Sequence, residues 1–481
     1  MQNYYQFIIS RLNGNEIRKR FPYYLSLVRK GIAGFIVFGG EIEQMRRHVG
    51  KLQNDAGLPL IIASDLERGL GQQIKGGTLF PPAMALAKAF RKNVGAGRDL
   101  PLLEKTFEAF AIEARYAGIN TIFAPVLDIN TNPKNPIIAT RAFGEDAETV
   151  SLFGREMIRA LQTLGIAACG KHFPGHGDTA VDSHIKLPVV TRSLRSLQTM
   201  ELKPFKEAMR TGVKMIMLGH LSVPAIDPSG IPLSISERAV GYLRKRMKYG
   251  GIVITDAMNM GGIGRYSEED ASYRALNAGV DIILHPTEPE RIASYLRTKR
   301  KVFHAERLQL FRKGLISLPA RYLPRFDAYR DLSRRLTEKS ITISGDYRIR
   351  MRSTPFLIIL SDEEIDKSAV FINRLREGLP GLKYRIMRPG SETHKTDLPD
   401  GQPVIVAVFS ETKAWKGGAS GWLFENISCL EDKADLFISF GSPYLLDPLA
   451  RTSKIYAYSD DESAQEAVAE LLLKKMKVLR R

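Results

Sequence analysis

The 481-residue sequence is poor in cysteine and has no long apolar run. Its two cysteines, Cys169 and Cys429, cannot form the disulfide framework of a small secreted domain. A membrane-spanning helix needs about 20 consecutive apolar residues, and the best candidate, 213–226, is interrupted by Lys214 and His220. The first residues lack a basic segment followed by an apolar core and a small-residue cleavage site. We therefore expect a soluble, cytoplasmic protein without a membrane partner.

The sequence also lacks the short motifs of several enzyme classes. It contains no HExxH pair and no pair of CxxC motifs, which are frequent zinc-binding patterns. It contains neither a GxxxxGK(S/T) loop nor a GxGxxG segment after a predicted strand. A kinase or a dehydrogenase is therefore not expected, and no metal or organic cofactor is predicted.

Positive charge is in excess, with 70 Lys and Arg against 52 Asp and Glu and a formal net charge of +18. Residues 291–352 hold 17 of the basic residues and 5 of the acidic ones, a net +12, interspersed with apolar side chains. This pattern is typical of a helix with a solvated basic face followed by a basic linker. A specific anionic partner is the alternative. No base-reading or aromatic stacking pattern accompanies the charge, so we expect no nucleic-acid partner. The sequence makes no prediction of the oligomeric state.

Eight apolar, β-branched segments alternate with amphipathic helical segments in the first part of the chain. The predicted strands are Phe7–Ile9, Gly34–Phe38, Leu60–Ala63, Thr121–Val126, Ala167–Gly170, Met215–Leu218, Ile252–Thr255 and Val280–Leu284. Alternation of strands and helices predicts parallel pairing, and continuous apolar strands predict burial on both faces. Eight such units within about 300 residues favour a (β/α)8 barrel over an open sheet.

Ionisable residues stand within two positions after six of these strands. They are Asp65, Asp128, Lys171 with His172, His220, Asp256 and His285. Catalytic groups of a (β/α)8 barrel lie at the carboxyl ends of its strands. A doubly wound sheet also binds ligands at that edge. The pattern therefore locates the functional site more firmly than it identifies the barrel.

The pattern of strands and helices restarts after the basic segment. The predicted strands there are Phe356–Leu360, Tyr384–Met387, Val404–Phe409, Leu436–Phe440 and Ile455–Tyr458. We predict a TIM-like catalytic barrel over residues 1–300 and a basic helical linker over 301–354. A smaller α/β sandwich domain is predicted over 355–481.

The densest group of chemically active side chains is the segment KHFPGHGDTAVDSH, Lys171–His184. Metal ligation by His172 and His176 is one reading, but the intervening Phe-Pro-Gly disfavours the helix that would align them. A purely structural loop is a second reading. The third is an acid–base pair, because Asp182 and His184 are close enough in sequence to touch in a bent loop. An Asp on one ring nitrogen would fix the tautomer and leave the other nitrogen to transfer a proton.

Asp256 ends an apolar strand in the segment GIVITDAMNMGG and has no adjacent cationic residue. A cap of the following helix would explain it in structural terms. Paired with a proton donor, it would instead suit the nucleophile of a retaining glycosidase, which attacks one face of the sugar.

Four segments together carry a family resemblance: KHFPGHGDTAVDSH, GIVITDAM, FAPVLDINTNPKNPIIATRAFGED and ASDLERG. They resemble glycoside hydrolase family 3, within it the β-N-acetylglucosaminidase branch of peptidoglycan recycling, over about residues 5–290. The segment FISFGSPYLL resembles the C-terminal domain of larger members. The resemblance implies removal of terminal, non-reducing β-linked N-acetylglucosamine with retention. The implied substrate is an N-acetylglucosamine-containing saccharide or muropeptide, with chitin fragments left open.

The same resemblance implies roles for individual residues. Asp256 matches the nucleophile, His184 the general acid/base and Asp182 the residue that orients it. The residues that match sugar-binding positions are Asp65, Arg141, Lys171 and His172. In this interpretation the cations Arg141 and Lys171 would also keep the pKa of Asp256 low.

One segment departs from the family pattern D-x-E-G-G-x-V-x-R. Gln73 stands where the arginine is usual, and Arg68 replaces the first glycine. This departure bears on how the substrate is bound more than on the type of reaction. Alternatives to an N-acetylglucosaminidase stay open. Phosphate could replace water as the acceptor in a glycoside phosphorylase, or the barrel could be a family 3 β-glucosidase-like or catalytically retired sugar-binding protein.

Overall fold

The computed structural model describes residues 2–90, 99–315, 322–345, 354–390, 401–410, 415–416 and 418–479. The chain divides into two units. The first, called the barrel unit, consists of Met1–Leu79, Arg98–Asn135 and Ala142–Arg330. The second, called the sandwich unit, consists of Phe80–Gly97, Pro136–Arg141 and Asp331–Arg481.

The barrel unit contains eight parallel strands that pair in sequence order and close on themselves. They are β1 Ile8–Asn13, β2 Gly34–Phe38, β3 Ile61–Ser64, β4 Thr121–Ile122, β5 Ala167–Phe173, β6 Met215–Leu218, β7 Ile252–Ala257 and β8 Ile282–Leu284. Closure is made by β1 and β8, where Ile8 pairs with Ile283 and Ile9 with Leu284. The predicted (β/α)8 barrel is confirmed.

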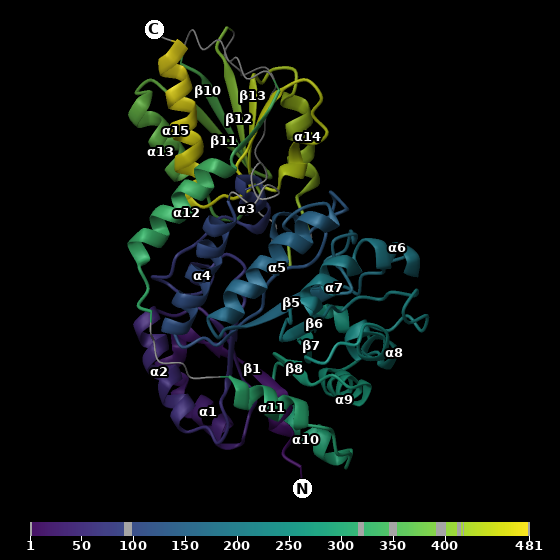
Figure 1. Cartoon of the computed structure of the whole chain (residues 1–481). Helices are drawn as coiled ribbons and strands as arrows, with labels where there is room; N and C mark the ends of the chain where they lie inside the picture. Colours follow the sequence, from purple (N-terminus) through teal and green to yellow (C-terminus); the bar gives the residue numbers. More distant parts are fainter. Residues whose placement is uncertain are drawn as a thin grey trace. The chain divides into compact units, whose positions relative to one another are not determined.

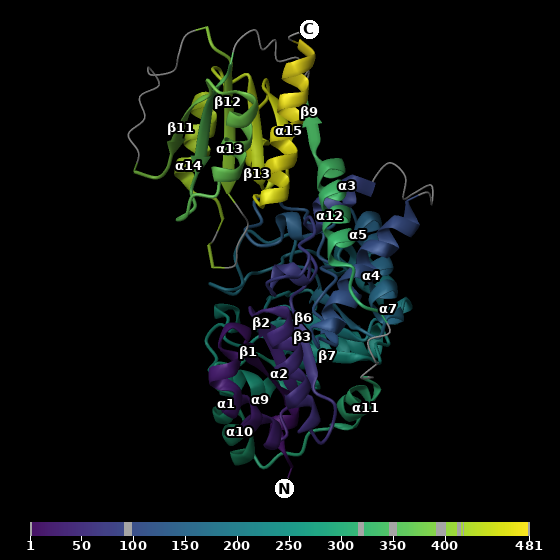
Figure 2. The same cartoon turned by 90° about the vertical axis from the view of Figure 1, so that its left-hand side faces the viewer.

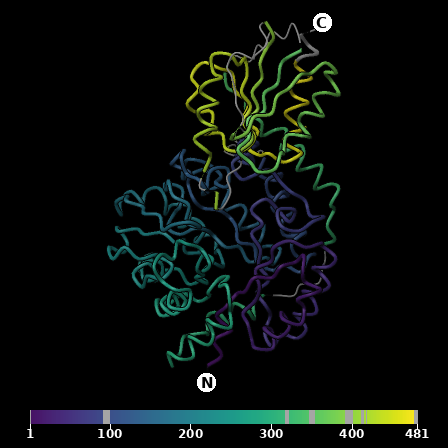
Figure 3. The backbone as a smooth tube through the Cα atoms, turned by 180° about the vertical axis from the view of Figure 1, so that it is seen from behind, coloured from purple at the N-terminus to yellow at the C-terminus, as the bar shows by residue number. Residues whose placement is uncertain are grey.

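Helices surround these strands, and the chain runs around the barrel in sequence order, from purple through teal to green (Figures 1 and 3). The helices are α1 Ile17–Arg29, α2 Ile42–Asn54, α4 Leu100–Tyr116, α5 Ala147–Thr163, α6 Leu194–Thr199, α7 Leu202–Arg210, α8 Glu237–Gly241, α9 Glu268–Ala278, α10 Pro289–Thr298 and α11 Glu306–Gly314. The short helical turns of the barrel unit are η1 Tyr4–Phe7, η2 Gly14–Glu16, η3 Leu70–Gln72, η5 Leu233–Ile235, η6 Tyr242–Arg246 and η7 Gly261–Ile263. Every residue of β3, β5 and β6 is buried, as expected for strands covered on both faces.

Side-chain caps explain where two of these helices begin. Asp146 accepts a hydrogen bond from the backbone N–H of Thr149 at the start of α5. Ser267 does the same for Asp270 at the start of α9, whose first turn is acidic and therefore favourable to the helix dipole. Helix α9 ends at Gly279, which has a φ of 98° and so adopts the left-handed conformation that glycine allows.

The sandwich unit is built on a six-stranded sheet of order β11-β10-β12-β13-β14-β9. Its strands are β9 Thr342–Ser344, β10 Phe356–Ser361, β11 Lys383–Met387, β12 Val404–Ser410, β13 Leu436–Gly441 and β14 Ser453–Tyr456. Figure 2 shows β11 and β9 at opposite edges of this sheet. The pairings are parallel except that β9 runs antiparallel to β14. β9 was not among the predicted strands.

Helices cover both faces of the sheet (Figure 1). α13 Ala369–Gly378 and α15 Glu462–Leu479 pack on one face, through side chains such as Phe371 and Leu472. α14 Gly421–Leu430 packs on the other, through Leu423 and Ile427. The other helical elements among the described residues of this unit are α3 Ala83–Phe90, η4 Ala139–Arg141, η9 Pro443–Leu446 and part of α12 Phe326–Ser340. The predicted smaller α/β sandwich is confirmed.

No helix in the described ranges is long and apolar enough to cross a membrane.

Candidate active site

The carboxyl end of β5 carries a buried lysine between two carboxylates. Lys171 exposes 2% of its surface, and its Nζ lies 2.7 Å from Asp65 Oδ1 and 2.6 Å from Glu67 Oε1. A buried ammonium is costly unless it is paired, and both carboxylates supply charge-assisted hydrogen bonds here. Glu67 was not predicted as a site residue. The available signal was its position two residues after Asp65 in the same turn.

His172 is held by a carboxylate that lies fully inside the barrel. Its Nδ1 is 2.7 Å from Asp128 Oδ2, and its backbone N–H donates to the same carboxylate. Burial opposes ionisation of Asp128, but the His172 and His176 imidazoles and the hydrogen bonds outweigh it and lower the pKa of Asp128. Because Asp128 occupies Nδ1, the Nε2 atom of His172 is the one left for a ligand.

The buried His176 ring is hydrogen-bonded to two hydroxyl groups of its own loop. Its ring nitrogens lie 2.8 Å from Ser183 Oγ and 2.9 Å from Thr179 Oγ1, and its backbone N–H donates to Asp128. Burial lowers the pKa of His176 to about 4, so the ring is neutral at physiological pH. Across the described ranges no group of three His, Cys, Asp or Glu side chains is arranged to hold a metal ion. The rings of His172 and His176 are hydrogen-bonded to a carboxylate and to two hydroxyl groups, respectively.

Asp182 and His184 form the pair that their spacing indicated. Asp182 Oδ1 lies 2.8 Å from His184 Nδ1 and also accepts the backbone N–H of His184 at 2.8 Å. The Asp182 side chain is almost fully buried at 1% exposure, whereas that of His184 is 20% exposed. The carboxylate is thus fixed from two directions, and the exposed imidazole can present Nε2 to a substrate.

Asp256 lies near the end of β7, with 8% of its surface exposed and Oδ1 accepting the backbone N–H of Ala257 at 2.8 Å. Burial would raise the pKa of Asp256. Attraction to the imidazoles of His172, His220 and His184 outweighs burial, so the pKa lies below its usual value. Arg141 and Lys171, the cations predicted to have this effect, are not among its leading causes. The three imidazoles are the leading causes that lower this pKa, and Lys171 is instead bonded to Asp65 and Glu67.

The loops that carry His184 and Asp256 are hydrogen-bonded to each other. The backbone N–H of Gly261, five residues after Asp256, donates to the His184 carbonyl at 2.9 Å. A Cβ at Gly262 would lie 2.7 Å from both the Ser183 carbonyl oxygen and the His220 Cβ, so a larger residue would push the two loops apart. The glycines after Asp256 therefore permit the close approach of the loop that carries Asp182 and His184.

His220 and His285 also lie at this edge of the barrel. His220 is fully buried, with Nδ1 2.6 Å from Ser234 Oγ and Nε2 3.0 Å from the Ala257 carbonyl oxygen, and burial lowers its pKa. Burial, assisted by Arg11, lowers the pKa of His285 to about 4. His220 thus supports the backbone immediately after Asp256.

Arg141 is the one predicted site residue that lies outside the barrel unit. It ends η4 in the sandwich unit, where its backbone N–H donates to the Ile138 carbonyl and its Nη1 to the Ile137 carbonyl. Its assignment to the sugar site stays a prediction. Residues 65–73, which differ from the family pattern, follow β3. In this segment the N–H of Arg68 donates to the Gln72 side chain and the N–H of Gln73 to the Leu70 carbonyl.

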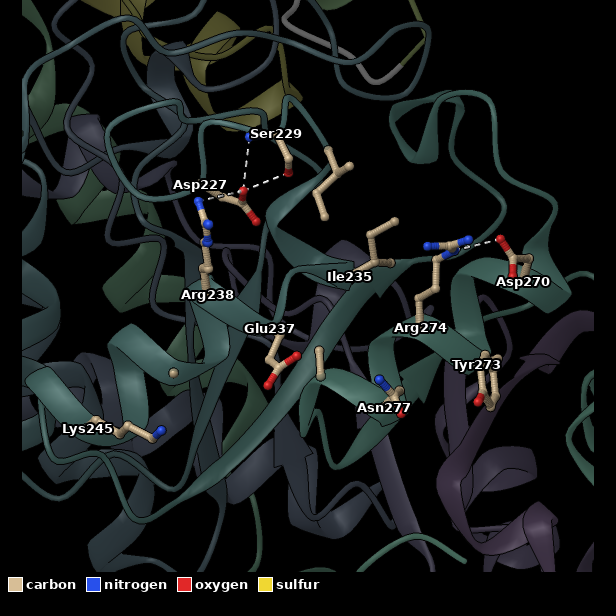
Figure 4. A pocket seen from close by; sticks show the side chains of 13 residues that line it. Asp227, Ser229, Ile235, Glu237, Arg238, Lys245, Asp270, Tyr273, Arg274 and Asn277 are labelled. Atoms are coloured by element: carbon tan, nitrogen blue, oxygen red, sulfur yellow. Dashed lines mark hydrogen bonds and ion pairs between the residues drawn. The ribbon is translucent and has the colours of Figure 1, made fainter. Parts of the chain in front are cut away.

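A separate pocket of about 750 Å³ lies among η5, α8, η6 and α9 and contains none of the predicted site residues (Figure 4). Its charged side chains neutralise one another in part. Arg274 Nε lies 2.7 Å from Asp270 Oδ2, and Arg238 Nη1 lies 3.9 Å from Asp227 Oδ1. Nothing in this arrangement resembles an acid–base pair, and we assign no reaction to the pocket.

The closed barrel, with carboxylates, a lysine and histidines at its carboxyl edge, defines a (β/α)8-barrel protein with a polar site at that edge. Residues 26–306, more than half of the chain, match the model of the glycosyl hydrolase family 3 N-terminal domain. The chain therefore belongs to glycoside hydrolase family 3, as its motifs predicted.

Several relatives are named β-hexosaminidases. β-Hexosaminidase A of Pseudoalteromonas piscicida is 33% identical over 284 residues, 54% of this chain and 46% of that protein. A β-hexosaminidase of Methylobacillus flagellatus is 30% identical over 283 residues, 58% of this chain and 80% of that protein. The chain thus spans about half the length of the Pseudoalteromonas relative.

A solved structure is similar over nearly the whole chain. The family 3 β-N-acetylglucosaminidase from Paenibacillus sp. FPU-7 is 28% identical, with a TM-score of 0.80. The match covers 98% of this chain and 96% of that one, so the similarity includes both the barrel and the sandwich.

Proposed function

We propose that this protein is a retaining glycoside hydrolase that removes terminal, non-reducing β-linked N-acetylglucosamine. The observation that carries the proposal is the Asp182–His184 pair, whose loop is hydrogen-bonded to the loop after Asp256. The names of the relatives support the same substrate class. Asp256 would be the nucleophile, His184 the general acid/base and Asp182 its orienting partner.

In the first step, the Asp256 carboxylate attacks the anomeric carbon and the bond to the leaving oxygen breaks. The His184 imidazolium donates its Nε2 proton to that oxygen and becomes neutral, while Asp182 accepts a hydrogen bond from Nδ1–H. Asp182 also stabilises the imidazolium when it forms again in the second step. In that second step, water attacks the glycosyl–Asp256 ester, Nε2 takes the water proton and the carboxylate leaves. Two inversions at the same carbon give net retention.

The low pKa of Asp256 suits this scheme because the nucleophile must be ionised at the working pH. Asp65, Lys171 and His172 would bind sugar hydroxyls, with Arg141 as a further predicted contact. Charge-assisted hydrogen bonds from these groups are stronger than neutral ones and would fix the ring against Asp256. We propose a muropeptide fragment as the natural substrate.

Labelling tests the nucleophile directly. A fluorinated N-acetylglucosaminide with a good leaving group should form a slowly hydrolysed ester, and peptide mass spectrometry should find it on Asp256. The Asp256→Ala variant should not be labelled and should lose at least about 10³-fold in kcat/KM on an aryl N-acetylglucosaminide. A label on another residue, or a product of inverted configuration, would contradict the proposal.

Parallel product analysis tests the substrate. We expect anhydro-muropeptide to be cleaved with a higher kcat/KM than chitobiose, and an aryl glucoside to be a poor substrate. Repeating each assay with and without phosphate distinguishes hydrolysis from phosphorolysis. Sugar 1-phosphate as the main product would replace hydrolysis by the phosphorylase alternative.

A further inference from the structure

Arg192 connects three polar groups beside the Asp182–His184 loop. Its Nε and Nη2 lie 2.9 and 2.7 Å from the two carboxylate oxygens of Asp178, and Nη2 donates to Thr131 Oγ1 at 3.2 Å. Thr131 in turn donates to Asp178 Oδ1 at 3.1 Å. The planar guanidinium thus bonds both oxygens of one carboxylate, a geometry that lysine cannot reproduce.

The same guanidinium faces a second, more deeply buried carboxylate. Glu201 is 2% exposed, and its Oε1 lies 3.1 Å from Arg192 Nε. Neither carboxylate oxygen has a hydrogen bond of good geometry within the described part of the chain. Burial raises the pKa of Glu201, and the charge of Arg192 opposes that rise. Glu201 therefore holds Arg192 by charge and makes its position costly to change.

Gly175, at the start of the loop, lies directly against Glu201. A Cβ on Gly175 would be 2.9 Å from the Glu201 Cβ, and Gly175 has a φ of +135°, which other residues rarely adopt. Both ends of the loop thus contact Glu201: Gly175 packs against it, and Arg192 forms an ion pair with it.

Asp178 and Arg192 are 14 residues apart in sequence, and Asp182 and His184 lie between them. The ion pair therefore closes the stretch of chain that carries the acid–base pair. Closing a loop removes most of the conformations that its free ends would otherwise sample. A proton donor must be held within hydrogen-bond reach of the leaving oxygen, so this restriction matters for proton transfer.

We propose that Arg192 is a positioning residue, which closes residues 178–192 through Asp178 and Glu201 so that the His184 imidazole meets the glycosidic oxygen. This inference rests on the proposed function and adds to it a determinant outside the substrate contacts. The bonds of His176 to Thr179 and Ser183, and of Gly261 to His184, remain when Arg192 is removed. Loss of Arg192 therefore loosens the loop without dissolving it.

Leaving-group dependence tests the proposal in the full-length protein. In Arg192→Met, kcat/KM should fall about 10-fold or more on chitobiose, whose leaving oxygen needs a proton. It should fall less than about 3-fold on a dinitrophenyl N-acetylglucosaminide, whose leaving group needs little protonation. Arg192→Lys, which keeps the charge but not the bidentate bond, should lie between wild type and Arg192→Met on chitobiose. Equal losses on both substrates, or no loss on either, would overturn the proposal.

Arg195→Met is the matched control, because Arg195 is exposed and lies three residues from Arg192. Its ratio of kcat/KM values on the two substrates should equal that of the wild type. If Arg192→Met does not fold, the ratio of kcat/KM values on the two substrates is measured for Arg192→Lys and Asp178→Asn instead. In Asp178→Asn the loss should again be larger on chitobiose.

Limited proteolysis gives a readout that does not depend on turnover. Lys186 is exposed within the closed loop, so trypsin should cleave after it about 10-fold or more faster in Arg192→Met than in Arg195→Met under native conditions. Unchanged cleavage would overturn the proposal that Arg192 closes residues 178–192. If the wild-type protein turns over no N-acetylglucosaminide, the proposed function fails, and the cleavage rate alone decides whether Arg192 closes the loop.

Discussion

The two halves of the segment 171–192 differ in how they are held. The strand end, with Lys171, His172 and His176, is buried and bonded to carboxylates from the segments that follow β3 and β4. The following stretch, 178–192, exposes His184 in part, as well as apolar side chains such as Ile185 at 53%. We call the buried half, residues 171–177, the floor and the half-exposed stretch, residues 178–192, the arm.

This difference matches the two roles that we propose for the two halves. A sugar-binding floor works best when its donors and acceptors are preorganised and cannot relax. An acid/base group serves two steps, giving a proton in one and taking it in the other, and must admit a leaving group and then water. We therefore expect substitutions of polar side chains in the floor to reduce mainly stability. Substitutions of polar side chains in the arm should reduce mainly activity on substrates whose leaving group needs a proton.

The largest expected effect on stability comes from removing the lysine of the floor. Lys171→Met leaves the Asp65 and Glu67 carboxylates without their cation, and the Glu67 side chain is only 7% exposed. Removing one partner of a buried ion pair typically costs about 3–5 kcal/mol. The unfolding free energy of the barrel unit, followed by urea denaturation with hydrogen exchange, should fall by this amount.

Lys186→Met is the control for this prediction, because Lys186 is an exposed lysine on the arm. Its effect should stay within about 0.5 kcal/mol, as for most surface substitutions. A loss below about 1 kcal/mol in Lys171→Met would mean that the two halves are not held as differently as their contacts indicate.

Removing the imidazole of the arm should mainly affect activity. His184→Ala should lower kcat/KM on chitobiose by about 10²–10³-fold, or about 3–4 kcal/mol, because a general acid contributes in that range. On the dinitrophenyl glycoside the loss should be far smaller, since the first step needs little protonation. Steady-state assays on both substrates measure the difference. Equal losses would indicate that His184 does not act as the proton donor.

The sequence was informative where the interactions are local or repetitive. Apolar runs predicted all eight barrel strands, and the residues after them located the polar edge. Asp182 and His184 could be paired because a bent loop brings residues two apart into contact. In contrast, β9, Thr342–Ser344, is a three-residue edge strand with two exposed side chains, so it gives no apolar signal within a basic segment.

Contacts between distant segments could not be read from the sequence. Lys171 meets Asp65 across 106 residues, and His172 meets Asp128 across 44. The partner of each depends on which strands become neighbours in the closed barrel and on the register between them. For the same reason the sequence predicted that Arg141 and Lys171 lower the pKa of Asp256, whereas the imidazoles of three histidines are its leading lowering causes.

A smaller effect is expected from pH, through the neutral histidine of the floor. The folded-state pKa of His176 is lowered to about 4 from 6.5, so the unfolded chain takes up the proton first. His176 therefore contributes stability that is present above pH 6.5 and is lost as pH falls toward 4. Between pH 7 and pH 5 this loss is about 2 kcal/mol.

The variant His176→Gln should remove that part of the pH dependence, whatever its effect on stability at pH 7. Urea midpoints measured from pH 7 to pH 5 should show a shallower decline in the variant. His304→Gln provides the control because the His304 side chain is fully exposed. A decline as steep in His176→Gln as in the wild type would mean that His176 is not held neutral by burial.

The smallest expected effect comes from an adjacent pair of valines on the arm, which differ almost only in burial. Val189 is 56% exposed and Val190 is 2% exposed. Val189→Ala should change the unfolding free energy by less than about 0.5 kcal/mol, whereas Val190→Ala should cost about 2 kcal/mol for two buried methyl groups and the cavity they leave. Urea denaturation of the two variants measures both values under one protocol. Equal costs at the two positions would mean that the outer face of the arm is packed like the floor, and the contrast between a fixed floor and an adjustable arm would then fail.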